Sequence, residues 1–202
     1  MDLSLDQLSL LPSQEFENLS PLLADRVQRT AAMLNEKNLG PFLDSTMKEL
    51  LNRSFQSAGA HEGAVWLVDR EQKNLVISHG WGPHAEIALG FRQPLDRGIV
   101  SMVFGMEQTF CENKVYANRL QARSLDQQLG ILTCSMIAVP LTFARSLRGV
   151  VSCIRVKRDP DAADPEDFAP GALANVQFAT HLLGKLLEFE IVGLITGWDN
   201  GL

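Results

Sequence analysis

The sequence predicts an α+β fold, in which a central antiparallel sheet of five to six strands has the N- and C-terminal helices packed on one face. Strand-like runs come in pairs joined by short polar turns, which is typical of antiparallel hairpins. Helical segments gather at both ends of the chain and do not alternate regularly with strands, which argues against a parallel α/β sheet. The length of 202 residues suits one domain with attached helices.

The N-terminal part is expected to be helical, with one interruption. Apolar residues recur at helical spacing from Phe16 to about Lys37. Residues 38–41 contain glycine and proline, which indicate a stop and a restart. A second helix with one apolar stripe is expected from Pro41 to Ala58. We therefore divide the chain into a leader and helix over 1–40, a main domain over 41–193, and a tail over 194–202.

The middle of the chain changes to strand character. The runs Ala64–Asp69 and Asn74–His79 flank a polar turn and predict a hairpin. A third, shorter strand is expected at Ile87–Phe91, followed by a short helix at Ile99–Phe104. A fourth strand is expected at Gln108–Glu112.

The second half is expected to close the sheet. Residues 114–130 form a long connection that contains one short helix with a capping-box sequence. A strand at Ser135–Phe143 and its partner at Gly149–Val156 predict a second hairpin. Pro140 cannot donate to a ladder, so it must lie at an edge, a bulge or an unpaired position. A last long helix is expected from about Gly171 to Gly193.

Composition and motif content narrow the function classes. A net charge of −6 without a basic stripe argues against nucleic acid as the main partner. No apolar stretch approaches the ~20 residues that a membrane helix needs. The first residues show no signal-peptide pattern, so we expect a cytoplasmic protein with reduced thiols. Neither a hydrolase motif nor a spaced cysteine and histidine set is present, so we expect no zinc or iron chemistry.

A glycine-rich segment, Gly80–Ala85, satisfies the pattern G-x-G-x-x-A. A dinucleotide site also requires a parallel partner strand and an acidic residue ~20 positions further on. The preceding strands are expected to be antiparallel, and residues 102–106 offer no acid. We interpret the segment as a loop. His79 and His84 border it and could meet a metal or an anion, but we interpret them as partly exposed loop residues.

Five segments follow one another in a recognisable order: Ala64–Asp69, Leu75–Ile77, Pro94–Ser101, Cys134–Leu141 and Leu147–Val151. Taken in this order, they resemble a GAF domain, the sensory module of phosphodiesterases, phytochromes and bacterial regulators. The resemblance implies an antiparallel sheet with helices on one side and a small-molecule pocket on the other. It also implies that the first and last helices pack together, commonly in a dimer. Members bind varied small molecules or serve only in dimerisation, so the ligand and any cofactor stay open.

The chain departs from the better-understood GAF subtypes. Cyclic-nucleotide binders carry an N-K…F-x-x-x-D-E signature; Asn113 and Lys114 match, but no acidic pair follows Phe168. Bilin binders use a cysteine that is often followed by histidine, and no cysteine here precedes one. Free methionine-R-sulfoxide reductases carry cysteines in the loop before the Val-Pro-Leu strand; here Cys111 and Cys134 only flank that loop.

The resemblance places a ligand against the sheet, under the 114–130 connection and beside the helix after Gly98. Residues expected to line this pocket, by their position in the family pattern, are Trp66, Ser101, Cys111, Cys134 and Ser135. The expected function is a non-catalytic sensory or regulatory domain. It would bind a small ligand or a protein partner and signal through its terminal helices as a homodimer.

Two alternatives to this function stay open. One is a thiol enzyme similar to the free methionine-R-sulfoxide reductases, which requires Cys111 and Cys134 within disulfide reach, with Cα atoms ~4.4–6.8 Å apart. The other is a ligand-free dimerisation module, whose pocket would be filled by its own side chains. The simplest interpretation of the three cysteines is that they are inert core residues without a chemical role.

Overall fold

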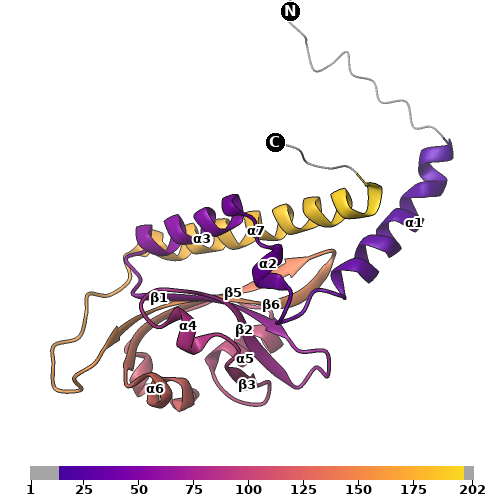
Figure 1. Cartoon of the computed structure of the whole chain (residues 1–202). Coiled ribbons are helices and arrows are strands. Elements are labelled where there is room, and N and C mark those ends of the chain that lie inside the picture. Colours follow the sequence, from indigo (N-terminus) through magenta and orange to yellow (C-terminus); the bar gives the residue numbers. More distant parts are fainter. Residues whose placement is uncertain (1–13, 198–202) are drawn as a thin grey trace, which may run out of the picture.

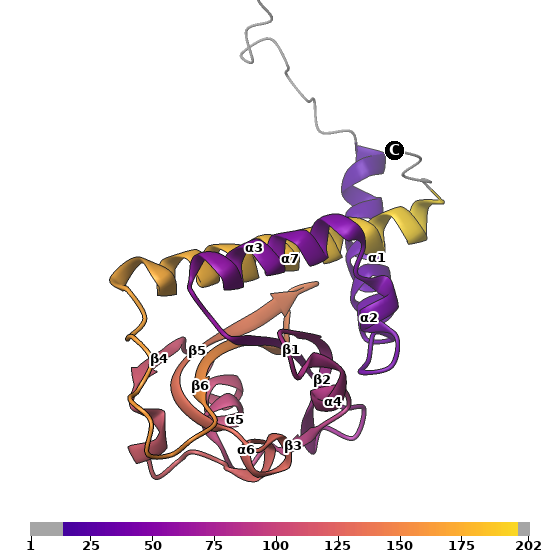
Figure 2. The same cartoon turned by 60° about the vertical axis from the view of Figure 1, so that its left-hand side comes forward.

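The structure is a computed structural model that describes residues 14–197, so the expected leader over 1–12 lies outside it, as do residues 198–202 of the tail. Its sheet has six antiparallel strands in the order β3-β2-β1-β6-β5-β4 and confirms the predicted class. The strands are β1 Glu62–Val68, β2 Asn74–Trp81, β3 Arg92–Pro94, β4 Phe110–Asn113, β5 Leu132–Phe143 and β6 Ser146–Lys157. The sheet is strongly curled, and its concave side encloses short helices (Figure 2).

Helices cover both faces of this sheet (Figure 1). The convex face carries α2 Leu39–Phe42, α3 Ser45–Ser57 and α7 Pro170–Thr196, and α1 Gln14–Ala31 packs beside α7. The concave side carries α4 Ala85–Ala88, α5 Ile99–Met106, the 3-10 turn η2 Val115–Ala117, and α6 Ser124–Leu129. No helix within residues 14–197 is long and apolar enough to span a membrane.

Alternation along the strands produces two separate hydrophobic cores, because successive side chains of a strand point to opposite faces. On β5, Ile137, Val139 and Leu141 pack in the core beneath α3 and α7. Their neighbours Met136 and Ala138 belong to the second core, on the concave side. The sheet is therefore the wall that separates the long helices from the short ones.

The N-terminal helices are shorter than the sequence predicts. The first helix ends at Ala31, not near Lys37, because a turn follows in which the backbone N–H of Asn35 donates to Asn38 Oδ1 at 2.7 Å. The expected helix from Pro41 to Ala58 is interrupted at Leu43, whose backbone is extended. Asp44 then caps α3 by accepting from the Met47 N–H at 2.7 Å.

The predicted strand at Ile87–Phe91 is wrong. Residues 85–88 instead form the helical turn α4, in which the Ala88 N–H donates to the His84 carbonyl. Gly90 then takes a left-handed conformation with φ of 80°, which reverses the chain. The strand follows this turn as β3, where Arg92–Pro94 pair with Asn74–Val76.

Pro140 lies where the sequence argument requires. It pairs with Val150 on β6, whereas the ladder with β4 on the other side of β5 ends at Ala138. The outer side of β5 is therefore open at this position, and the missing N–H leaves no neighbouring strand unsatisfied.

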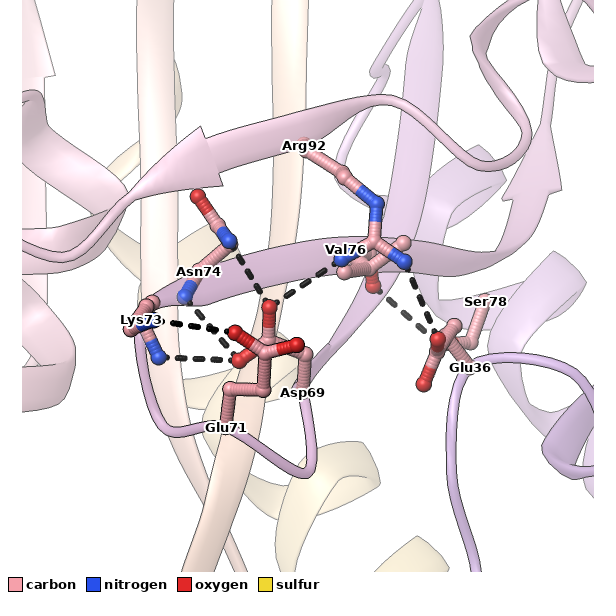
Figure 3. A network of polar contacts seen from close by, with 8 residues as sticks. All are labelled: Glu36, Asp69, Glu71, Lys73, Asn74, Val76, Ser78 and Arg92. Carbon is pink, nitrogen blue, oxygen red and sulfur yellow. Dashed lines mark hydrogen bonds and ion pairs between the residues drawn. The ribbon is translucent and has the colours of Figure 1, made fainter.

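A polar network fixes the hairpin between β1 and β2 (Figure 3). Asp69, which is 6% exposed, accepts from the Lys73 N–H at 2.8 Å and from the Asn74 side chain at 2.7 Å. Arg92 on β3 donates to Asp69 at 3.0 Å and to Glu36, in the turn after α1, at 3.1 Å. The network therefore joins the turn, the edge strand and the N-terminal segment.

Replacing Asp69 with asparagine is expected to lower the free energy of unfolding by about 2 kcal/mol at neutral pH, because a buried acceptor and its ion pair are lost. Burial raises the pKa of Asp69, but hydrogen bonds from Asn74 and Lys73 and the charge of Arg92 outweigh it and hold the pKa below its usual value. The native contribution is therefore complete above the unfolded pKa of about 3.9 and is lost as pH falls through the lower folded pKa.

Urea unfolding of wild type and Asp69→Asn at neutral pH and near pH ~2–3 measures this difference. Asp96→Asn is the control, since Asp96 is 74% exposed and pairs with its neighbour Arg97, and it should change stability by less than ~0.5 kcal/mol. A deficit of Asp69→Asn that stayed constant down to the acid end would contradict the assignment.

Candidate functional site

A cavity of about 80 Å³ lies between the concave face of the sheet and the short helices. Its floor comes from β1, β2, β5 and β6, and its cover from α4, the start of α5 and residues 121–129. Most of its wall is apolar, as is usual for small-molecule sites. The polar side chains on the wall are Glu62, His84, Gln93, Gln121, Asp126, Thr133 and Ser152.

Trp66 is the one predicted pocket residue that the structure brings to this wall. Its indole Nε1–H donates to Ser152 Oγ at 2.8 Å across β1 and β6, which fixes the ring orientation. The ring also meets Phe91 edge-on, with centroids 6.3 Å apart. Trp66 therefore offers the cavity a rigid aromatic face whose own donor is already used.

The other four predicted residues lie away from the cavity wall. Ser101 is buried and donates to the Pro94 carbonyl at 2.8 Å, which ties α5 to β3. Cys134 and Ser135 are buried at a β-bulge of β5, whose flanking residues Thr133 and Met136 reach the cavity instead. Cys111 is exposed on β4. Sequence position alone could not locate the bulge, which shifts the inward-facing side chains by one residue.

Cys111 and Cys134 are not within disulfide reach. Cys111 pairs with Ile137 on β5, three residues from Cys134. At ~3.3 Å per residue this separates the two by roughly 10 Å along the strand, whereas a disulfide needs Cα atoms within ~7 Å. All three cysteines are free thiols. The two flanking thiols are thus not arranged to form a disulfide.

Desolvation makes all three thiols poor nucleophiles, although Cys111 is exposed on the surface and is not the core residue that was expected. It raises the pKa of Cys153, in the core beneath α7, to about 12. Burial likewise raises the pKa of Cys111 and of Cys134 above their usual values. A thiolate is the reactive form, so these shifts oppose thiol chemistry near neutral pH. They agree with the interpretation of the cysteines as inert.

Glu62, which the sequence did not indicate, and His84 form a pair at one end of the cavity. His84 Nδ1 lies 2.6 Å from Glu62 Oε1, and the His84 N–H donates to the other carboxylate oxygen at 3.2 Å. His84 is therefore a partly exposed turn residue, as expected, with its side chain 14% exposed and paired with Glu62. Gly82, with φ of 107°, permits this contact, since a Cβ there would meet Glu62 Oε2.

His79, the other histidine beside this loop, lies on a different part of the sheet. It pairs with Val65, whose side chain belongs to the core under α3. Burial and the nearby charge of Lys48 lower its pKa. His79 and His84 therefore do not share a site, and no group of three potential metal ligands occurs within residues 14–197. The antiparallel pairing of β2 also excludes a dinucleotide fold at the glycine-rich loop.

Asp126 is a second carboxylate on the cavity wall, contributed by α6. It is 7% exposed and accepts from the Thr133 N–H at 2.9 Å and from Thr133 Oγ1 at 2.7 Å. These bonds join α6 to the start of β5, just before the bulge. Burial raises the pKa of Asp126, although the hydrogen bonds from Thr133 and Gln121 work in the opposite direction.

Comparison with solved structures identifies the fold. The GAF domain of a phosphoenolpyruvate-protein phosphotransferase from Coxiella burnetii superposes with a TM-score of 0.57 at 15% identity, over 90% of this chain and 97% of that one. The second GAF domain of DevS from Mycobacterium smegmatis gives a TM-score of 0.57 at 11% identity, over 74% and 96%. A free methionine-R-sulfoxide reductase from Thermoplasma acidophilum gives 0.54 at 14% identity, over 72% and 92%.

The likeness is one of structure, because no family model and no curated protein matches the sequence. The chain has the GAF fold, as the ordered segments of its sequence predict. At these identities the likeness extends to the fold and not to a ligand or a reaction.

Proposed function

We propose that this chain is a non-catalytic GAF module that binds a small molecule on the concave side of its sheet and transmits binding through α1 and α7. The observation that carries the proposal is the cavity, which its own side chains leave open and which combines apolar walls with a few convergent polar groups. The cavity also argues against a ligand-free dimerisation module, whose pocket would be filled.

The route from the cavity to the helices passes through the sheet. Ser152 and Ile154 of β6 face the cavity, while Val151 and Cys153, which alternate with them along the strand, pack in the core beneath α7. Gly184 brings α7 against β5, since a Cβ there would lie 2.4 Å from the Thr142 carbonyl oxygen. Because the packing is close, a shift of β6 or β5 on ligand binding would therefore displace α7.

Replacing Ala122 with phenylalanine tests ligand binding. Ala122 lies on the cavity wall, so a larger ring there should occupy the space and exclude a ligand. We expect native mass spectrometry of the wild type, purified from its host, to detect a bound small molecule that Ala122→Phe lacks. Hydrogen exchange of α7 should rise in the variant toward that of the ligand-free wild type.

Leu120→Phe is the matched control, because Leu120 lies in the same connection but is 54% exposed. It should retain the ligand and the wild-type exchange of α7. A wild type that carries no small molecule and exchanges like Ala122→Phe would contradict the proposal.

A reductase remains the competing function, since a solved structure with this fold acts as a free methionine-R-sulfoxide reductase. The separated, high-pKa thiols Cys111 and Cys134 disfavour it. Turnover of free methionine sulfoxide by the wild type with a thiol reductant, lost on replacing either cysteine with serine, would overturn the non-catalytic proposal.

We further propose that α1 and α7 form the interface of a homodimer. Apolar side chains on these helices remain exposed although α1 contacts α7; they are Leu19, Leu22 and Leu23 on α1 and Phe178, Phe189 and Leu194 on α7. Exposed patches of this kind mark interaction surfaces.

A further inference from the structure

The charged groups on the cavity wall are predominantly acidic. Glu62 and Asp126 supply two carboxylates and His84 one imidazole, while neither lysine nor arginine lies among the lining residues of the described chain. An anionic ligand would meet two carboxylates in an apolar surrounding without a free cation to balance its charge. Like charges brought together in this way oppose binding, so nucleotides and other phosphates are poor candidates.

The two carboxylates differ in the partners that they have. Glu62 has His84 at 2.6 Å. Asp126 accepts hydrogen bonds only from neutral groups, the backbone and hydroxyl of Thr133 and the side chain of Gln121. Within residues 14–197 it forms no ion pair, and the charge of Arg123 acts on it without a direct contact. Asp126 is thus a buried carboxylate that lacks a cation.

A buried charge of this kind is costly unless it is paired. The raised pKa of Asp126, caused by burial, is the expected sign of that cost. The unpaired carboxylate borders a cavity and not a packed core, so its missing partner can come from a ligand. Trp66 on the same wall adds an aromatic face that attracts cations.

We propose that the cavity binds a small organic cation, an apolar body with one protonated amine, whose amine pairs with Asp126. The proposal rests on the proposed function and names the ligand class of its site. The volume of about 80 Å³ is well below the ~300–1,000 Å³ of sites for drug-sized ligands, so the ligand is a small one.

Three probes of equal size and different charge test this proposal at neutral pH: benzylamine as the cation, benzyl alcohol as the neutral form, and benzoate as the anion. The readout is the nuclear magnetic resonance signal of the Trp66 indole N–H group, on the cavity wall. Benzylamine should shift this signal with an affinity at least about tenfold above that of benzyl alcohol, as expected for a hydrogen bond to a charged group. Benzoate should leave the signal unchanged.

Asp126→Asn should reduce the benzylamine affinity to that of benzyl alcohol, while Asp96→Asn, on an exposed carboxylate, should keep the wild-type preference. Ala122→Phe should abolish binding of all probes. If Asp126→Asn fails to fold, the order of the three probe affinities in the wild type and the result for Ala122→Phe still decide whether the cavity prefers a cation.

Benzoate binding as tightly as benzylamine, or an amine preference that survives in folded Asp126→Asn, would overturn the cation proposal and leave ligand binding intact. If none of the three probes shifts the Trp66 indole signal, the cation proposal fails as well. Native mass spectrometry of the wild type then decides separately whether the cavity binds any ligand.

Discussion

Replacing Gly149 with valine is expected to lower the free energy of unfolding by about 3 kcal/mol or more and the melting temperature by roughly 6–12 °C. Gly149 lies inside β6 and pairs with Leu67 on β1 and Leu141 on β5. A Cβ at this position would lie 1.8 Å from the Trp66 carbonyl oxygen. The obstacle is backbone in the centre of the sheet, so relief requires two central strands to move apart.

Thermal unfolding followed by circular dichroism measures this loss. Gly171→Val is the matched control, because a Cβ at Gly171 would meet nothing within 4 Å, and its effect should stay below ~1 kcal/mol. Since β1 carries Trp66, Gly149→Val should also disturb the cavity floor. Equal melting temperatures of Gly149→Val and the control would show that the strands tolerate the side chain and would contradict this account.

The sequence predicts the strands of the sheet but not the short turn that joins β5 to β6. The hairpin between β5 and β6 was expected to span residues 144–148, yet β6 begins at Ser146. Ala144 and Arg145 form the connection with φ of 50° and 58°. Turns with such positive φ values are usually recognised in a sequence by glycine or asparagine, and neither occupies these two positions. The Ala144 N–H donates to Glu188 on α7 at 2.8 Å. A tertiary contact therefore supports the turn, and local sequence gives no sign of it.

Less of the candidate site than of the fold could be predicted from the sequence. The apolar, β-rich runs predicted the strands, and the family pattern placed Trp66 in the pocket. The Glu62–His84 pair joins residues 22 positions apart through a left-handed glycine. The environment of Asp126 depends on the β-bulge that directs Thr133 toward it. Neither arrangement has a local signature. The family pattern, which assigned Cys134 and Ser135 to the cavity, does not show where the bulge of this chain lies.

Replacing Leu194 or Leu22 with glutamate is expected to convert a homodimer into a monomer while the sheet domain stays folded. Both side chains lie on the terminal helices and are exposed, at 64% and 62%. The apolar pattern of the last helix also predicts Leu182 and Phe189 in the interface; Phe189 is exposed at 50%, whereas Leu182 is partly buried. The exposed positions therefore make the sharper test, because a charge there costs the monomer little.

The arrangement of α1 and α7 supports a proposed interface that includes both helices. The N-terminal part of α1 and the C-terminal end of α7 both project beyond the sheet (Figure 1). The sheet domain itself cannot cover these parts, whereas a second copy related by a two-fold axis would bury the same surfaces on both chains. A glutamate in such an interface would be desolvated without a partner, which costs several kcal/mol.

Light scattering across a concentration series measures the change in mass. Met106→Glu is the control, because Met106 is exposed at 58% but lies on α5, on the concave side of the sheet, and the variant should remain a dimer. A wild type that is monomeric at high micromolar concentration would contradict the homodimer. The apolar surface of α1 and α7 would then belong to a different protein partner, and Leu22→Glu should abolish that association instead.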